Sequence, residues 1–441
     1  MTQRRQFASF NEYKYNKLMQ EDFSWHKAPK RSGFWTKTIM VVFFLAVLIA
    51  GALVGLKYLN QDKESAIEKS NANANQASEG LAIPPKVAQN KFGFLSGGKD
   101  DTIFLSAVAA GWVRPHPGPF LWDAMQKDTS SNYDFSVTDE VVKNFQANNI
   151  AILATLWPFV EWDQKNHKDP QNCKVSDKDE FLAKNASPSM GLAGSPQASL
   201  PSAQLGINEV NGYLPQSRCN PTDWVSYQKW LAALVDRYNG DGRNDMPGLK
   251  IPIKYWEIMN EPDLNADGKS DQLTFYKETP QAYGELLVKS YQAIKSVDSE
   301  ARVLIAGAAG ADEKFLQFYR TALTDNEAAQ FFDIGNVHCI SNDKGTDDFN
   351  VKAYQKMLTD LGVNKQVWVT EAEKFTGNSL EENYQATSLS TKGAIAAGAQ
   401  KIFFTRTDFG DTRKDMSQPY TPTQQSIDQS TKLYKELIGG L

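Results

Sequence analysis

Short apolar runs alternate with amphipathic stretches along residues 91–441. This alternation is typical of an α/β protein in which crossover helices join parallel strands. Eight strands are predicted, at residues 91–95, 111–114, 150–156, 254–259, 302–306, 334–338, 366–370 and 401–405. Eight helices are predicted after them, at residues 102–110, 138–148, 222–238, 280–297, 313–323, 347–361, 383–397 and 427–438. Eight strand–helix units in one domain predict a (β/α)8 TIM barrel.

A longer apolar run precedes this domain. Residues 39–56 are 18 consecutive positions without a charged group, with Trp35 and Tyr58 close to the two ends. Such a run can cross a hydrocarbon core of about 30 Å. A cleaved signal peptide is the alternative, but the run is longer than an ordinary signal core and no small-residue cleavage motif follows it closely. We therefore predict a single transmembrane helix that stays uncleaved as a signal anchor.

The charge distribution orients this helix. Residues 1–38 hold 8 Lys and Arg against 3 Asp and Glu, which leaves 39 against 49, or −10, for the rest of the chain. By the positive-inside rule, the N-terminus is predicted to be cytoplasmic and the barrel extracytoplasmic, at the cell membrane. An acidic body argues against nucleic acid as a partner.

Composition divides the chain into four parts. Residues 60–90 are rich in Ser, Asn, Ala, Gln, Glu and Lys, and too polar to bury enough surface to order themselves. We predict a cytoplasmic segment at residues 1–34, the transmembrane helix at residues 35–59, a disordered linker at residues 60–90 and the barrel at residues 91–441.

The three cysteines fit an exported domain. Cys173 and Cys219 lie in one irregular region and could pair in an oxidising compartment. Cys339, next to His338, would then be a small buried side chain. No Cys/His set has the spacing of a zinc site, so no transition metal is expected.

Two of the predicted strands run directly into a glutamate. The fourth is followed by Asn260 and Glu261, and the seventh ends in Thr370 and Glu371. Strand ends of a parallel barrel open onto its active-site face, where a carboxylate is poorly placed for packing and well placed for chemistry. Three strand–helix units separate the two acids, so they should face each other across the mouth. Glu373 is the rival of Glu371, but it lies past the predicted strand.

Side-chain alternation supports this placement, because every second residue of a strand points to the same face. We expect two sets to point inward, Glu257, Met259 and Glu261 in the fourth strand and Val367, Val369 and Glu371 in the seventh.

Three segments together carry a family resemblance: residues 256–262 (WEIMNEP), 367–371 (VWVTE) and 112–120 (WVRPHPGPF). They resemble the clan A glycoside hydrolases, (β/α)8 enzymes that cleave glycosidic bonds with retention of configuration. The resemblance covers roughly residues 91–441. It implies that Glu261 is the acid/base, that Glu371 is the nucleophile and that Arg114 braces the nucleophile. His338 occupies a sixth-strand position where related enzymes place His or Tyr.

Cleavage with retention of configuration requires a pair of carboxyl groups such as Glu261 and Glu371. It needs two carboxyl groups about 5–5.5 Å apart, one protonated to serve the leaving oxygen and one ionised to attack the anomeric carbon. An Arg beside Glu371 would keep that group charged, whereas Glu261, less well compensated, would have a raised pKa. Asn260, next to the acid, can hydrogen-bond the sugar 2-hydroxyl.

The other predicted substrate-binding residues each have a structural alternative. Arg114 could neutralise a buried acid such as Glu257 as well as brace the nucleophile. His338 lies at a strand tip and is predicted to belong to the site, while His116 lies in a proline-rich loop where both roles stay open. Trp157 follows the third strand and could stack on a sugar or only pack.

After the eighth strand the chain departs from the clan pattern. Many members carry a Trp there that floors the sugar subsite, whereas Thr405 or Arg406 stands near that point here. Arg406 could recognise an acidic sugar or pair with Asp408, and we favour the pair. The departure leaves the substrate class open.

One loop could hold a cation. Residues 263–271 match the first half of an EF-hand loop, but Thr274 stands where the twelfth-position Glu is expected. A polar loop explains the same letters, so we predict no metal and no cofactor, with calcium at residues 263–271 as the alternative.

These observations predict a membrane-anchored retaining glycoside hydrolase whose substrate is an extracytoplasmic oligo- or polysaccharide. Two alternatives stay open: a non-catalytic carbohydrate-binding barrel, and a transglycosylase. Sugar, linkage, and endo or exo action depend on loop shape and are not predicted.

Overall fold

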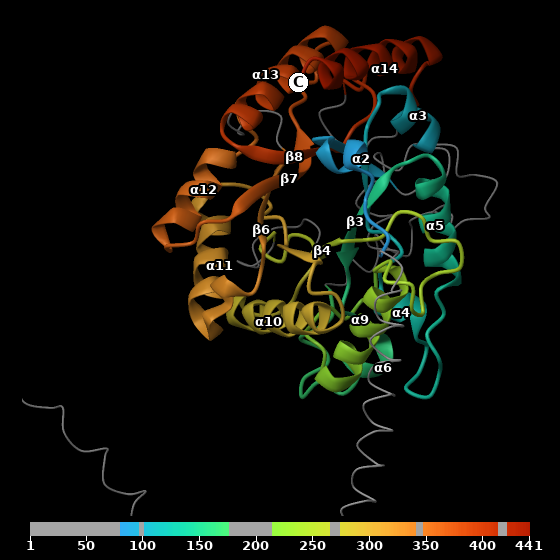
Figure 1. The fold of residues 1–441 in the computed structure, drawn as a ribbon. Coiled ribbons are helices and arrows are strands. Elements are labelled where there is room, and N and C mark those ends of the chain that lie inside the picture. The colour runs from blue at the N-terminus through green and yellow to red at the C-terminus, as the bar shows by residue number, and fades with distance from the viewer. Residues whose placement is uncertain (1–79, 97–100, 176–213, 265–273, 341–346, 413–420) are drawn as a thin grey trace, which may run out of the picture. The chain divides into compact units, whose positions relative to one another are not determined.

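The computed structural model describes residues 80–96, 101–175, 214–264, 274–340, 347–412 and 421–441 (Figure 1). They belong to one unit of the chain, Ser78–Leu441. The predicted cytoplasmic segment and transmembrane helix lie outside the described residues. Within the described ranges, no helix has both the length and the apolar character needed to cross a bilayer.

Eight parallel strands pair in chain order and close into a barrel, which confirms the predicted fold. Each begins and ends within three residues of its predicted position. Their bounds are β1 (Phe92–Ser96), β2 (Trp112–Pro115), β3 (Ala151–Leu156), β4 (Tyr255–Ile258), β5 (Arg302–Ile305), β6 (Ile334–Ile340), β7 (Gln366–Glu373) and β8 (Ala399–Phe404).

A ring of helices surrounds the strands (Figure 1). The predicted helices form as α3 (Asp101–Ala107), α5 (Ser136–Ala147), α9 (Trp224–Tyr238), α10 (Pro280–Val297), α11 (Glu313–Thr324), α12 (Val351–Asp360), α13 (Leu380–Ala396) and α14 (Gln424–Gly439). The described ranges also contain short helices that were not predicted: α2 (Pro85–Gln89), α4 (Trp122–Met125), α6 (Glu161–Gln164) and the 3-10 helix η2 (Asp325–Gln330).

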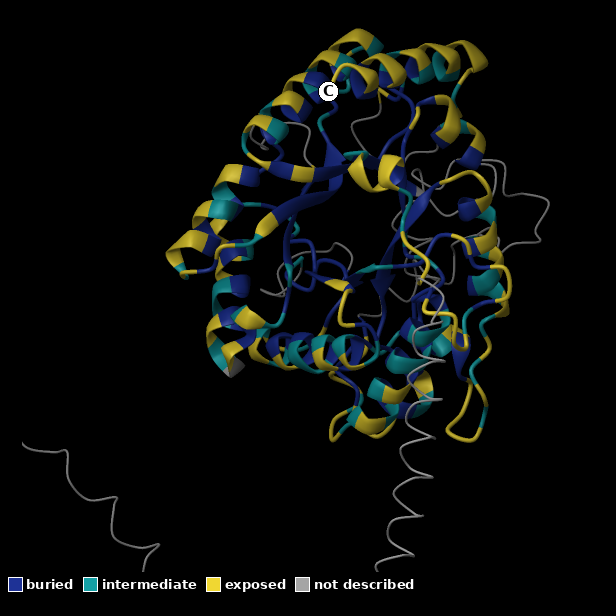
Figure 2. Ribbon diagram, viewed as in Figure 1, coloured by how far each residue is buried: buried dark blue, intermediate teal, exposed yellow. Residues whose placement is uncertain are grey.

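The sheet separates two apolar clusters. The larger one fills the space between strands and helices, and the smaller one fills the barrel. Strand side chains of the inner cluster are Leu95, Trp112, Ala151, Leu153, Leu304, Ile334, Trp368 and Phe403. Figure 2 shows the result, with buried strands inside and exposed residues on the outer faces of the helices. The burial of apolar area on both faces of the sheet holds the barrel together.

The described fold begins earlier than predicted. Residues 80–90, assigned above to the disordered linker, include α2, and Val87 is buried against the inner cluster. The Val87 carbonyl accepts a hydrogen bond from the Trp112 indole at 2.9 Å. Pro85 at the first helical turn favours the helix, because its fixed φ suits that position. The linker prediction is therefore wrong for residues 80–90, while residues 60–79 lie outside the described ranges.

The cysteines follow the prediction. Cys173 and Cys219 form a disulfide, and Cys339 is buried in the outer cluster. Asp223 caps α9, accepting a hydrogen bond from the Ser226 amide at 3.0 Å.

Candidate active site

Arg114, fully buried on β2, is the centre of a polar network inside the barrel. Its Nε donates to Oε2 of Glu257 at 2.7 Å, its Nη1 to Oε1 of Glu371 at 2.8 Å and its Nη2 to Oδ1 of Asn260 at 2.6 Å. The guanidinium therefore joins β2 to the ends of β4 and β7. Both roles left open by the sequence, neutralising Glu257 and contacting the predicted nucleophile, are present.

Glu257 accepts hydrogen bonds from three further side chains of this network. Its Oε2 also accepts from the Thr155 hydroxyl, and its Oε1 accepts from the Asn336 amide and from the Thr370 hydroxyl. Thr155, Asn336 and Thr370 are all fully buried. Each carboxylate oxygen has two donors, which compensates the desolvation of a charge in the barrel interior.

Glu261 lies against His338. The Nδ1 of His338 is 2.7 Å from Oε1 of Glu261 and 3.8 Å from Oε1 of Glu371. One oxygen of each glutamate and a ring nitrogen of His338 all lie within 4.8 Å of one another. The two acids predicted from the strand ends therefore meet, and both are nearly buried, with exposures of 5% and 4%.

The surroundings of the two acids change their pKa values. Burial raises the pKa of Glu261 to about 8, opposed by the charge of Arg114 and reinforced by Glu257. Burial also raises the pKa of Glu371, but here His338 and Arg114 both work against the increase. Since Arg114 hydrogen-bonds directly to Glu371, the first proton to leave the pair comes from Glu371. Glu261 is the group that stays protonated near neutral pH.

The hydrogen bonds of His338 agree with this assignment. Its Nε2 is 2.8 Å from the Thr370 hydroxyl, which has a single proton to give and lies within reach of two acceptors, Glu257 Oε1 and Asn336 Oδ1. Nε2 must then be the donor to Thr370. Burial lowers the pKa of His338 to about 4, so the ring is neutral and its Nδ1 carries a lone pair. That lone pair accepts a hydrogen bond from the protonated carboxyl group of Glu261.

An irregular backbone brings the acids inward. On β7, Val367 and Val369 belong to the outer cluster and Trp368 to the inner one, so the predicted inward face of β7 is wrong. In a regular strand Glu371 would point outward with Val369. The pairing with β8 shifts register on both sides of Val369, and the pairing with β6 shifts once, between Val369 and Glu371, which places Glu371 opposite His338. Bulges next to active sites re-aim side chains in this way.

The end of β4 is also irregular. Glu257 points inward as predicted, but Met259 and Glu261 have φ values of +71° and +39°. Few non-glycine residues adopt this region, and each does so at a cost in free energy. Alternation alone did not place Glu261, because the chain turns sharply between Met259 and Glu261. The polar contacts of Glu261 and Asn260 hold that turn.

The predicted loop residues lie beside this network. His116 is 3.4 Å from Arg114, measured from Nδ1 to Nη1, and its ring packs against Trp157 and Phe275. Burial and Arg114 lower the pKa of His116 well below its usual value. Trp157 is fully buried, and its indole donates to the Pro117 carbonyl. A ring without an open face favours the packing alternative for Trp157 over sugar stacking.

Glu373, the rival of Glu371, is engaged elsewhere. It accepts from Arg406 at 2.5 Å and from Thr405 at 2.8 Å. Arg406 also pairs with Asp411 at 3.3 Å, so the expected partner, Asp408, was wrong. Asp408 instead accepts from the hydroxyls of α14. The guanidinium is buried against Glu373 and Asp411, and among the described residues its Nε and Nη1 have no hydrogen-bond acceptor.

Asp263, the first residue of the EF-hand-like motif, is buried and already bonded. It accepts from the Ala309 amide at 3.0 Å and lies 3.4 Å from the Tyr319 hydroxyl. Burial and the neighbouring Glu261 raise its pKa well above the usual value. Residues 265–273 of the motif lie outside the described ranges.

Sequence reasoning missed part of the network. Thr155, Asn336 and Thr370 were not identified as site residues, although each is a polar residue inside an apolar strand. Alternation gives the signal: Asn336 and His338 share a face of β6, and Arg114 and Trp112 share a face of β2. Polar side chains on the inner face of several strands indicate a buried network.

No protein-family model and no curated protein matches the sequence. The structure is similar to that of a glucosidase from Croceicoccus marinus, with a TM-score of 0.50 and 12% identity, over 82% of this chain and 69% of that one. A family 39 glycoside hydrolase from Bacteroides cellulosilyticus WH2 has a TM-score of 0.44 and 14% identity, over 72% of this chain and 57% of that one. Xylanase XynB from Paenibacillus barcinonensis has a TM-score of 0.43 and 12% identity, over 75% of this chain and 88% of that one. The chain thus spans little more than half the length of the family 39 enzyme. The similarity to the glucosidase establishes the fold, a (β/α)8 barrel.

Proposed function

We propose that the chain is a retaining glycoside hydrolase, with Glu261 as acid/base and Glu371 as nucleophile. One observation carries the proposal: an oxygen of each acid lies within 4.8 Å of an oxygen of the other. Retaining enzymes hold their carboxyl groups about 5–5.5 Å apart, whereas inverting enzymes need about 6.5–9.5 Å to admit a water molecule. The fold shared with a glucosidase supports the same reading.

The reaction proceeds in two displacements. The ionised Glu371 attacks the anomeric carbon while Glu261 gives its proton to the leaving oxygen, which breaks the glycosidic bond and forms a glycosyl ester. The Glu261 carboxylate then takes a proton from water, and the resulting hydroxide displaces Glu371 from the sugar. Arg114 stabilises the carboxylate of Glu371 before attack and after release. Asn260, held by Arg114, is placed beside the acid to bind the 2-hydroxyl.

We also propose that the enzyme is anchored to the cell membrane. Residues 35–59 would span the bilayer, residues 1–34 would lie in the cytoplasm, and the barrel would act on an oligo- or polysaccharide outside it. The Cys173–Cys219 disulfide supports an oxidising compartment for the barrel.

Substitution of the two acids tests the catalytic proposal. The full-length protein is assayed against dinitrophenyl and methyl glycosides of a panel of sugars. Glu261→Ala should lose activity on the methyl glycoside by about 10⁴-fold, and keep the first step on the dinitrophenyl glycoside, whose leaving group needs no acid. Azide should restore its turnover, because azide attacks without a general base. Glu371→Ala should be inactive on both substrates.

Glu373→Gln is the matched control, since Glu373 lies two residues beyond Glu371 and bonds to Arg406. It should keep glycosidase activity if it folds. Equal activity of wild type and both alanine variants on every glycoside would refute hydrolysis by this pair and leave the non-catalytic barrel. An alcohol acceptor that diverts the sugar from water into a new glycoside would identify a transglycosylase.

A further inference from the structure

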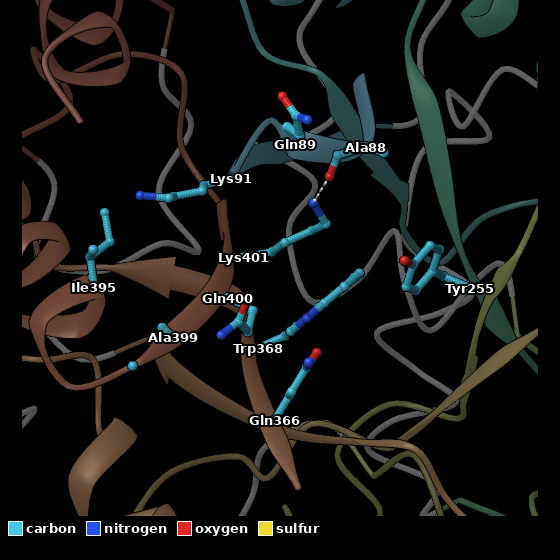
Figure 3. A pocket seen from close by; sticks show the side chains of 11 residues that line it. Ala88, Gln89, Lys91, Tyr255, Gln366, Trp368, Ile395, Ala399, Gln400 and Lys401 are labelled. Atoms are coloured by element: carbon cyan, nitrogen blue, oxygen red, sulfur yellow. Dashed lines mark hydrogen bonds between the residues drawn. The ribbon is translucent and has the colours of Figure 1, made fainter. Parts of the chain in front are cut away.

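A pocket lies at the opposite end of the barrel from Glu261 and Glu371. It is about 400 Å³ in volume and is formed where β4, β7 and β8 begin, beside α2 and α13 (Figure 3). We call it the basal pocket. Its lining residues are Ala88, Gln89, Lys91, Tyr255, Gln366, Trp368, Ile395, Gly398, Ala399, Gln400 and Lys401.

One buried donor in the basal pocket has no acceptor. Trp368 is 2% exposed, and among the described residues none accepts a hydrogen bond from its Nε1. The neighbouring Trp112 shows the contrast, because its indole donates to the Val87 carbonyl. Tyr255 and Phe403 stack on Trp368, with ring centroids 4.9 Å and 6.1 Å away, and Trp368 lines the pocket. A buried indole N–H without a protein acceptor can donate to an oxygen atom of a bound ligand.

The basal pocket also carries positive charge. Two lysines and no Asp or Glu side chain line it, and the Lys91 ammonium donates to the Leu441 backbone oxygen at 3.2 Å. The Lys401 ammonium donates to the Ala88 and Asn90 carbonyls and lies 4.3 Å from the centre of the Trp112 ring, and no acid in the described part of the chain pairs with it. Burial lowers the pKa of Lys401 to about 8. A nearby anion would restore favourable electrostatics for this buried cation.

The rest of the lining suits hydroxyl groups. Gln89, Gln366 and Gln400 supply amides, each of which both donates and accepts. Figure 3 shows Gln366 and Gln400 next to Trp368, and Gln89 beside Ala88. Tyr255 adds a partly exposed ring. A simple anion would leave the amide oxygens without donors, and a neutral sugar would leave the lysines without a counter-charge.

We propose that the basal pocket binds a small acidic sugar, of the hexuronic acid class. Its carboxylate lies on the side of Lys91 and Lys401, its hydroxyls bond to the glutamine amides, and one oxygen accepts from Trp368. This inference does not depend on the proposed glycosidase activity, because none of its residues belongs to the network around Arg114.

Calorimetric titration of the full-length protein in detergent tests the proposal. The probes are D-glucuronate, D-glucose and acetate at one ionic strength. D-glucuronate should bind, and D-glucose and acetate should each bind at least about ten-fold more weakly, since each lacks half of the required groups. Trp368→Phe, which removes the indole N–H but keeps a ring, and Lys91→Gln should each weaken D-glucuronate binding about ten-fold.

Lys356→Gln is the matched control, because Lys356 is an exposed lysine of α12 that pairs with Asp360. It should bind D-glucuronate as the wild type does. If Trp368→Phe fails to fold, Lys91→Gln and Gln366→Ala carry the test at the pocket rim. Equal affinity for D-glucose and D-glucuronate would overturn the proposal. Binding that no basal-pocket variant alters would overturn it too, since the ligand would then lie elsewhere.

Discussion

Glu261 and Glu371 are the same chemical group in two environments. Both are buried, but Arg114 donates directly to Glu371, while Glu261 faces the neutral ring of His338. A cation stabilises the ionised form of one acid, and a lone pair stabilises the protonated form of the other. The division of labour between nucleophile and acid therefore follows from which neighbour each carboxyl group has.

The pKa of Glu261 predicts the alkaline limb of activity. Only the protonated acid can assist the leaving group, and its pKa is raised to about 8. Activity should be present below that value, and kcat/KM on a methyl glycoside should fall as the pH rises through about 8. A pH–rate profile measures this. Glu261→Ala on a dinitrophenyl glycoside should lack the limb, and a wild-type profile flat up to pH 10 would contradict the assignment.

Arg114 is predicted to be a stability residue as well as a site residue. Arg114→Met removes the cation shared by Glu257 and Glu371 and leaves two buried acids without their partner. Loss of one partner from a buried pair costs about 3–5 kcal/mol. Urea unfolding should show a loss of this size. Arg320→Met, which removes an ion pair to the exposed Glu313, should cost about 1 kcal/mol or less.

At the scale of elements, the sequence was informative about strands and helices and less so about their ends. The alternation of apolar runs located every strand, because burial on both faces leaves a clear pattern. It misassigned the inner face of β7, since the register shift that turns Glu371 inward depends on pairing with β6 and β8. Pairing is a long-range property, and no local pattern around Val369 records it.

The site shows the same limit. Motifs found Glu261, Glu371, Arg114 and Asn260, which the structure brings together, because chemistry requires those side chains. Burial of Trp157 could not be predicted, since it depends on Phe275, which lies far away in sequence. Contacts between distant segments decide whether a rim aromatic packs or stays open.

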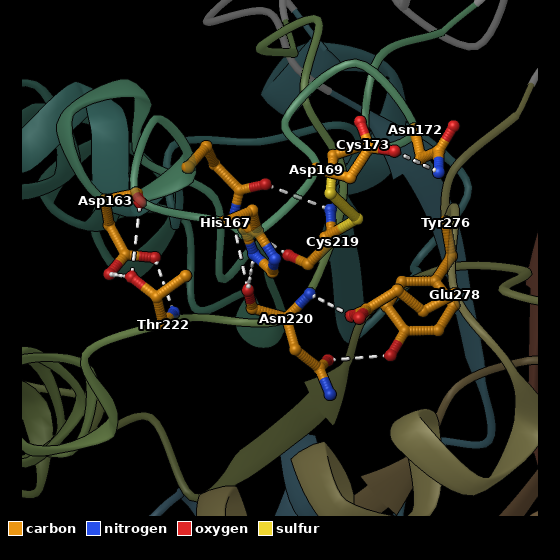
Figure 4. The surroundings of a disulfide bond; sticks show 11 residues. Asp163, His167, Asp169, Asn172, Cys173, Cys219, Asn220, Thr222, Tyr276 and Glu278 are labelled. Atoms are coloured by element: carbon orange, nitrogen blue, oxygen red, sulfur yellow. Dashed lines mark hydrogen bonds between the residues drawn. A yellow bond between two sulfur atoms is a disulfide. The ribbon is translucent and has the colours of Figure 1, made fainter.

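The disulfide is predicted to stabilise the connection between β3 and α9. Figure 4 shows the Cys173–Cys219 disulfide beside Asn220, which accepts a hydrogen bond from the Tyr276 hydroxyl. The Cys219 amide donates to the Gln164 side chain. Replacing both cysteines with serine should lower the free energy of unfolding by about 2–5 kcal/mol. Thermal unfolding with and without reductant measures it. Reductant should lower the Tm of wild type and leave the double variant unchanged, and an unchanged wild-type Tm would contradict a stabilising bridge.

At the scale of the whole molecule, Glu261 is predicted to reduce the free energy of unfolding. The pKa of Glu261 is about 8 in the folded protein against 4.5 for an ordinary Glu. The unfolded chain releases this proton above pH 4.5 and the folded chain does not, so this contribution to stability is complete below pH 4.5 and is lost as the pH rises to about 8. At pH 7 the loss is about 3 kcal/mol.

Glu261→Gln, which cannot ionise, should therefore raise the Tm, and by more at pH 8 than at pH 4. Thermal unfolding at the two pH values measures the difference. Glu313→Gln, at an exposed position on α11, is the control and should show no comparable dependence on pH. A variant less stable than wild type at pH 8 would show that the proton on Glu261 carries no such cost.

The proposed anchor predicts the orientation of the whole chain. Basic residues precede the apolar run at residues 39–56, and few follow it closely, so the barrel should be translocated. With an epitope at each end of the chain expressed in a bacterial cell, protease added outside the inner membrane should remove the C-terminal epitope and spare the N-terminal one. Exchanging Lys27, Lys30, Arg31 and Lys37 for Glu should make the N-terminal epitope less protected from the protease, because the charge bias that orients the helix would be lost. Deleting residues 1–59 should release the barrel from the membrane fraction. A chain that stays membrane-bound after this deletion would locate its attachment in the barrel instead.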